Sequence, residues 1–142
     1  MRILLAGIAA LLLATPLASA RFSERKLESS MASASKSGKL VAFVFYQGYA
    51  LPNCPKCISS TNANNKAIKS AIPRSDVVVI EVEPGDKDLD KLPAAVGGAK
   101  RGPAIVVTDA MCEKVVAKID GAPDREKAKE FKAAVEEARG EG

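Results

Sequence analysis

Residues 39–57 read KLVAFVFYQGYALPNCPKC, a run that joins an apolar segment to two cysteines separated by two residues. The apolar, β-branched and aromatic part, 39–46, is typical of a strand that is buried on both faces. Pro55 is favoured in the first turn of a helix, where its missing N–H is not needed. The stretch therefore predicts a buried strand, a loop, and a helix to about residue 72 with Cys54 as its N-cap and Cys57 in its first turn.

The rest of the chain predicts further helices and strands around this stretch. Apolar residues at helical spacing and β-branched runs bounded by turn residues distinguish the two. Gly38 is expected to end the first helix, and Asp124 to cap the last. The predicted helices are 22–37, 87–96 and 124–139, and the strands are 76–83, 103–109 and 114–120. A strand-helix-strand unit followed by a hairpin and a closing helix predicts an α/β domain, with a mixed sheet that carries helices on both faces.

Residues 1–20 have the layout of a cleaved secretory signal peptide. Arg2 precedes an apolar run, and small residues stand at positions 18 and 20, which a signal peptidase reads. The run is shorter than the ~20 residues of a membrane-spanning helix. We therefore expect cleavage near Ala20, a single mature domain over 21–142, and an exported protein that is periplasmic or extracellular. An N-terminal membrane anchor is the alternative.

The composition excludes several classes of function. The chain has 142 residues, with 21 lysines and arginines against 17 aspartates and glutamates, and no histidine or tryptophan. Without histidine, a Ser-His or Cys-His hydrolase and a metal site with imidazole ligands are excluded. The charges are scattered and no basic block is interleaved with aromatic residues, so no nucleic-acid partner is expected. We expect no cofactor, and a monomer.

The two cysteines of the CPKC motif fit a reversible redox disulfide, a static structural bridge, or half of a metal site. A helix N-terminus favours the thiolate of Cys54, and Lys56 adds a positive charge. No acidic residue lies between positions 43 and 75 to oppose them. Cys54 is thus predicted to be the exposed attacking thiol and Cys57 the more buried resolving thiol. The metal alternative is weaker, because a structural zinc site needs four ligands and the chain has three cysteines.

Taken together, these segments resemble the thioredoxin-fold family, and most of all its exported bacterial members, over about residues 23–139. The quoted segments are KLVAFVFY (39–46), CPKC (54–57), GGAKRGPAIVV (97–107) and KVVAKIDGAPDREKAKEF (114–131). The resemblance implies a three-layer sandwich with a central four-stranded sheet. It also implies that Cys54 and Cys57 are catalytic. Pro55, Lys56, Gly102 and Pro103 would support them, with Pro103 as a cis-proline that faces the cysteines. Asn53 stands where the family usually carries tryptophan, and the strand before the motif lacks the family's buried acid.

The function expected from this pattern is a thiol–disulfide oxidoreductase. Its substrates would be protein thiols or disulfides, and a separate partner protein would recycle it. The alternatives are a non-catalytic thioredoxin-fold module that binds a protein and a thiol-based copper or zinc carrier.

The third cysteine, Cys112, lies in the turn of the predicted hairpin. At about 3.3 Å per residue, the strand that begins at Pro103 carries it roughly 20 Å from the CPKC motif. A disulfide needs Cα atoms within about 7 Å. We therefore expect Cys112 to be a free thiol, or to pair with another chain.

Overall fold

The computed structural model describes residues 22–48 and 53–141, so the predicted signal peptide lies outside the described residues. It contains a four-stranded sheet with the strand order β2-β1-β3-β4. The strands are β1 (Leu40–Phe45), β2 (Val77–Val82), β3 (Ala104–Thr108) and β4 (Val115–Asp120), and the helices are α1 (Glu24–Ser37), α2 (Pro55–Ala71) and α3 (Arg125–Gly140). β1 runs parallel to β2 and antiparallel to β3, which pairs antiparallel with β4. The predicted mixed sheet and the hairpin are confirmed.

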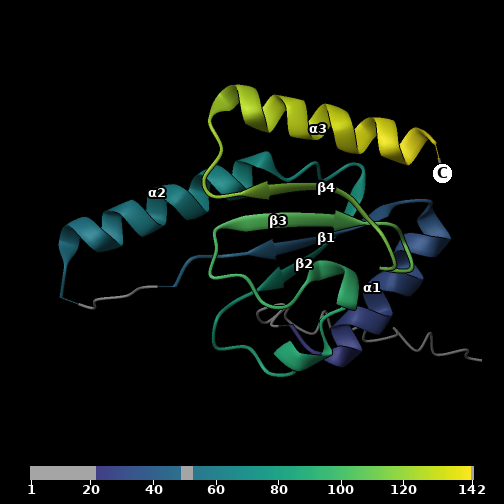
Figure 1. Cartoon of the computed structure of the whole chain (residues 1–142), viewed down its shortest axis with the longest axis horizontal. Coiled ribbons are helices and arrows are strands. Elements are labelled where there is room, and N and C mark those ends of the chain that lie inside the picture. The colour runs from purple at the N-terminus through teal and green to yellow at the C-terminus, as the bar shows by residue number, and fades with distance from the viewer. Residues whose placement is uncertain (1–21, 49–52, 142) are drawn as a thin grey trace, which may run out of the picture.

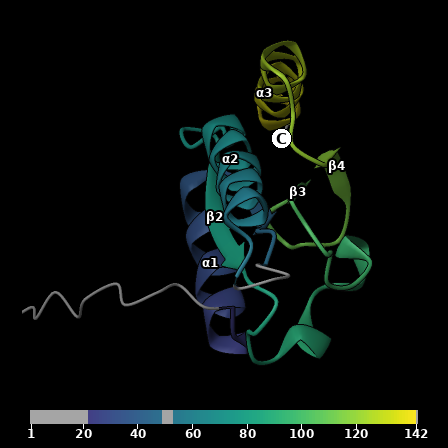
Figure 2. The ribbon, with the colours of Figure 1, turned by 90° about the vertical axis from the view of Figure 1, so that its left-hand side faces the viewer.

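The sheet forms the middle of three layers, because β1 is buried on both faces. Val41, Phe43 and Phe45 point into the core on the α1 side. The alternate residues of β1, among them Ala42 and Val44, point into the core on the α2 and α3 side. Figures 1 and 2 show α1 on one side of the sheet and the other two helices on the opposite side. The apolar run of β1 thus has no solvent-facing side, as its composition predicts.

Local signals placed the ends of two helices correctly. α1 ends at Gly38, which adopts φ +65°, a backbone angle that glycine tolerates better than other residues. α3 begins after Asp124, whose side chain accepts the backbone N–H of Lys127 at 2.8 Å. At its other end, Arg139 donates to the carbonyl of Ser75 at 2.8 Å and pairs with Asp76 at 3.0 Å.

The predicted helix over 87–96 is wrong. The segment forms two short 3₁₀ turns instead, η1 (Leu89–Lys91) and η2 (Ala94–Val96). Pro93 lies between them, and a proline excludes the residue before it from the helical region. Leu92 accordingly has an extended ψ of 140°.

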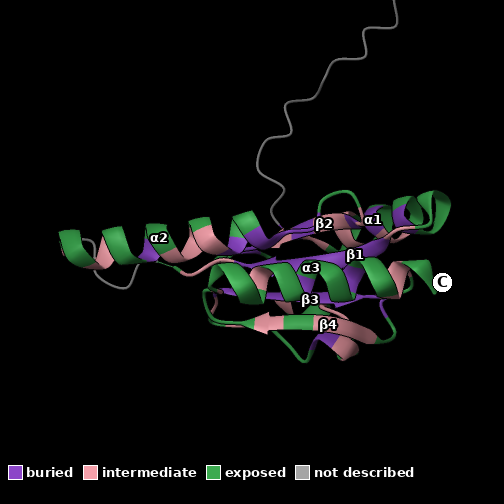
Figure 3. Cartoon of the chain, turned by 90° about the horizontal axis from the view of Figure 1, so that it is seen from above, coloured by how far each residue is buried: buried purple, intermediate pink, exposed green. Residues whose placement is uncertain are grey.

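The position of α2 along the sheet decides where the CPKC motif lies. The buried residues of this helix are Thr61, Ile68 and Ala71, so its first six residues contain none. Figures 1 and 3 show these first turns extending beyond the end of the sheet. No helix within 22–48 or 53–141 is long and apolar enough to cross a bilayer.

Candidate redox site

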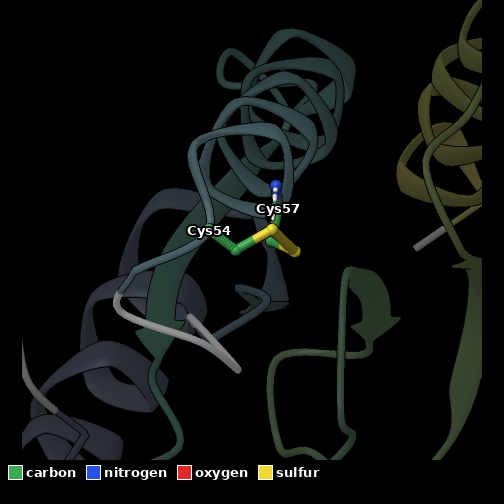
Figure 4. Close-up of a disulfide and its surroundings, with 2 residues drawn as sticks. All are labelled: Cys54 and Cys57. Atoms are coloured by element: carbon green, nitrogen blue, oxygen red, sulfur yellow. Dashed lines mark hydrogen bonds between the residues drawn. A yellow bond between two sulfur atoms is a disulfide. The ribbon is translucent and has the colours of Figure 1, made fainter.

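The CPKC motif forms the N-terminal end of α2, as the sequence predicts. Cys54 is the N-cap with an extended backbone (φ −114°, ψ 96°), and Pro55 occupies the first position of the helix. The Cys54 Sγ accepts the backbone N–H of Cys57 at 3.2 Å, in the place that a serine or aspartate oxygen usually takes at an N-cap. The two cysteines form a disulfide with a Cα–Cα distance of 5.2 Å (Figure 4).

The two cysteines fall in the same range of solvent exposure. Cys54 and Cys57 are both partly exposed, whereas Pro55 and Lys56 are exposed. Cys54 is thus partly and not fully exposed, and the prediction that Cys57 is the more buried of the two stays a prediction. The first turns of α2 extend past the end of the sheet (Figure 3), and none of the first six residues of the helix is buried.

The charges that α2 itself brings to the motif are positive. The only charged residues of α2 are Lys56, Lys66 and Lys69, and its first turn contains no acid. The helix N-terminus adds the partial positive charge of its unpaired N–H groups. Both effects stabilise an anion at Cys54 Sγ, which already accepts one backbone N–H. The arrangement therefore suits a cysteine that acts as a thiolate.

Gly102 and Pro103, the other predicted support residues, lie where β3 begins. The peptide bond between them is cis, as predicted, and Pro103 is buried. Gly102 has φ +65°, and a Cβ atom at this position would lie 2.8 Å from the carbonyl carbon and oxygen of Tyr46. Only glycine therefore fits here without a shift of the backbone beyond β1. The predicted contact of Pro103 with the Cys54 sulfur stays a prediction. The first turns of α2 extend beyond the end of the sheet at which β3 starts (Figure 1).

Sequence reasoning missed the residues that hold the chain after β1 against α2. The side-chain amide of Asn65 accepts the backbone N–H of Gln47 at 2.8 Å and donates to its carbonyl at 3.0 Å. Asn64 donates to the Gln47 side chain at 3.0 Å. The polar run SSTNANN (59–65) has low helix propensity. This low propensity was the feature of the sequence that could have indicated a role for these residues. These bonds fix the start of the segment that leads to the CPKC motif.

A groove of about 520 Å³ lies beside this contact, and neither cysteine lines it. Tyr46 contributes one wall, and its hydroxyl donates to Glu81 Oε1 at 3.2 Å. Burial, followed by the charge of Glu81 and the hydrogen bond to it, raises the pKa of Tyr46 to about 12.

Cys112 is a free thiol, as predicted for a cysteine in the β3–β4 turn. Its side chain is buried and its backbone has φ +57°. Burial raises the pKa of the Cys112 thiol, a hydrogen bond with Thr108 opposes that effect, and the charge of Asp109 adds to it. Within the described ranges, no three His, Cys, Asp or Glu side chains are grouped so that they could hold a metal ion.

Comparison with known proteins identifies the fold. No protein-family model matches the chain, and no curated protein matches it by sequence. The structure of a poplar thioredoxin h mutant superposes with a TM-score of 0.54 at 16% identity, over 82% of this chain and 81% of that one. A disulphide isomerase from Xylella fastidiosa Temecula1 gives a TM-score of 0.41 at 16% identity, over 84% and 94% of the two chains. The chain thus has the thioredoxin fold, as the sequence resemblance implied.

Proposed function

We propose that this protein is an exported thiol–disulfide oxidoreductase that acts on protein thiols or disulfides through Cys54 and Cys57. The observation that carries the proposal is the disulfide at the first turn of α2, with the Cys54 sulfur as the helix N-cap. A static bridge is a poorer explanation, because closing so short a loop adds little stability. The thioredoxin fold agrees with redox use of the motif.

In the reducing direction, the Cys54 thiolate attacks one sulfur of a substrate disulfide. A Cys54–substrate mixed disulfide forms and one substrate thiolate leaves. The Cys57 thiolate then attacks Cys54 Sγ, closes the Cys54–Cys57 disulfide and releases the second substrate thiolate. Two electrons pass from the protein to the substrate, and the reverse sequence oxidises a dithiol.

The neighbouring residues would assist these steps in different ways. The N–H of Cys57 and the charge of Lys56 stabilise the Cys54 thiolate. Pro55 starts the helix and so orients both sulfurs. Gly102 and the cis Pro103 would present backbone to an extended substrate segment by strand addition. A separate exported redox protein would regenerate the starting state.

Single-cysteine variants test the proposal. Wild-type protein should catalyse insulin reduction or the oxidation of a reduced substrate protein. Cys57→Ser should accumulate a mixed disulfide with the substrate, because no second thiol displaces it, and Cys54→Ser should not. Cys112→Ser is the matched control and should keep full turnover, since Cys112 is buried and outside the disulfide.

Other outcomes would favour the alternative functions. Absence of turnover in both directions, together with no trapped complex in either variant, would contradict the proposal and favour a non-catalytic protein-binding module. Stoichiometric copper or zinc in the reduced protein, lost in Cys54→Ser, would favour a metal carrier.

A further inference from the structure

Asp86 is a buried carboxylate that the redox proposal does not use. It lies in the turn after β2, and only 8% of its surface is exposed. Its Oδ2 accepts two backbone N–H groups, from Glu83 at 2.8 Å and from Phe22 at 3.0 Å. No cation of residues 22–48 or 53–141 pairs with it. A buried charge held only by neutral donors is costly unless it is paired.

The Phe22 contact brings together segments that are 64 residues apart in the chain. The Phe22 side chain is 1% exposed and belongs to the same core cluster as Phe43 and Phe45. Core packing therefore holds the Phe22 nitrogen in place against the carboxylate. Arg21 directly precedes this residue in the sequence, and arginine is a residue after which many peptidases cleave.

We propose that Asp86 is a binding site for the α-ammonium group of a mature chain that begins at Phe22. Hydrolysis of the Arg21–Phe22 bond consumes one water molecule, leaves a carboxylate on Arg21 and creates an ammonium on Phe22. An exported peptidase specific for basic residues would perform this step, or would remove Arg21 after cleavage at Ala20. The site is independent of the CPKC chemistry.

The new charge would strengthen a contact that already exists. In the uncleaved chain the Phe22 nitrogen is a neutral amide donor, and after cleavage it is a cation at the same distance from Asp86 Oδ2. The amide contact is already charge-assisted by the carboxylate, and cleavage adds the attraction between two opposite full charges. The fold has already removed the carboxylate from water, so only the desolvation of the ammonium is new. Maturation would therefore stabilise the folded state.

The first measurement identifies the amino terminus. The full chain, expressed with residues 1–21 and exported by a bacterial host, should yield a mature protein whose first residue is Phe22 by intact mass and terminal sequencing. A first residue at any other position overturns the proposal.

The second measurement tests the ion pair directly by urea unfolding. One chain begins at Phe22, and its partner carries a single glycine before Phe22, which keeps the N–H donor and moves the charge away. We expect the unfolding equilibrium constant to be on the order of tenfold larger for the glycine-extended chain. Equal stability of the two chains would overturn the proposal. Both chains keep Asp86, so this comparison changes only the position of the amino terminus.

Substitution of the carboxylate assigns the effect to Asp86. In an Asp86→Asn background the difference between the two chains should disappear. The matched control is Asp88→Asn, because Asp88 is an exposed carboxylate of the same loop that accepts the Glu24 N–H at 3.3 Å. In that background the difference should persist. An undiminished difference with Asp86→Asn would contradict the assignment.

Discussion

Replacing Asn65 by leucine should weaken the contact between α2 and the chain that follows β1. Leucine has nearly the shape of asparagine but no hydrogen-bonding atoms. The substitution removes the 2.8 Å bond from the Gln47 N–H and the 3.0 Å bond to the Gln47 carbonyl. A main-chain donor and a main-chain acceptor would both lose their partner.

The magnitude follows from these two bonds. Each neutral hydrogen bond contributes about 1 kcal/mol net, so their loss costs about 2 kcal/mol. Leucine has the better helix propensity by about 0.4 kcal/mol, which offsets part of the loss. Asn65 is only partly buried, so water can replace some of the lost partners. We expect the free energy of unfolding to fall by about 1–2 kcal/mol.

Equilibrium urea unfolding measures this difference, and Asn64→Leu is the matched control. Asn64 is the adjacent residue on the same helix and donates one bond, at 3.0 Å, to the Gln47 side chain. Its replacement leaves the backbone of Gln47 satisfied, and we expect a loss below about 0.5 kcal/mol. Equal losses for the two variants, or a neutral Asn65→Leu, would refute the claim that the backbone pairing holds α2 in place.

Three further predictions concern the redox motif and Tyr46. In the reduced protein at mildly acidic pH, Cys54 should alkylate faster than Cys57, because the helix N-terminus and Lys56 favour the Cys54 thiolate. Mass mapping would measure both rates, and Lys56→Glu should slow the alkylation of Cys54. Faster alkylation of Cys57 would reverse the assigned roles. The reduction potential, measured against glutathione, should lie above that of thioredoxin (about −270 mV) and nearer that of disulfide isomerase (about −180 mV), because a stabilised thiolate favours the reduced form; a value at or below that of thioredoxin would contradict this reasoning. Because the pKa of Tyr46 is raised to about 12 in the folded state, the folded protein keeps a proton that the unfolded chain loses, and the free energy of unfolding should fall as pH rises from about 10 to about 12. Tyr46→Phe should remove that part of the decline, which paired unfolding titrations would detect.

The sequence predicted the fold correctly where the burial of a single helix or strand is visible in the spacing of its apolar residues. The apolar run of β1 predicted a central strand, and β1 is buried over its whole length. The motif itself was also placed correctly, with Cys54 as the N-cap of α2. The failure at 87–96 has a local cause, because Pro93 outweighs the apolar spacing around it.

Accessibility at the candidate site could not be predicted in the same way. The motif specifies a helix start, but it does not specify how far the first turns of α2 extend past the sheet (Figure 3). The chain after β1 is joined to α2 by Asn65 and Gln47, which are 18 residues apart and pair through a side-chain amide and a main chain. Such a pair has no periodicity that would distinguish it from other polar residues.

The sequence alone therefore determined the three α-helices, the four strands, their order and the helix start at the CPKC motif, since helix caps, prolines and runs of apolar residues act over a few neighbouring residues. Only the tertiary structure decided the contacts between distant residues. Phe22 meets Asp86 across 64 residues, and Arg139 meets Asp76 across 63. The donors and acceptors in these contacts are common groups, and their geometry exists only after the hydrophobic cores on the two faces of the sheet have formed.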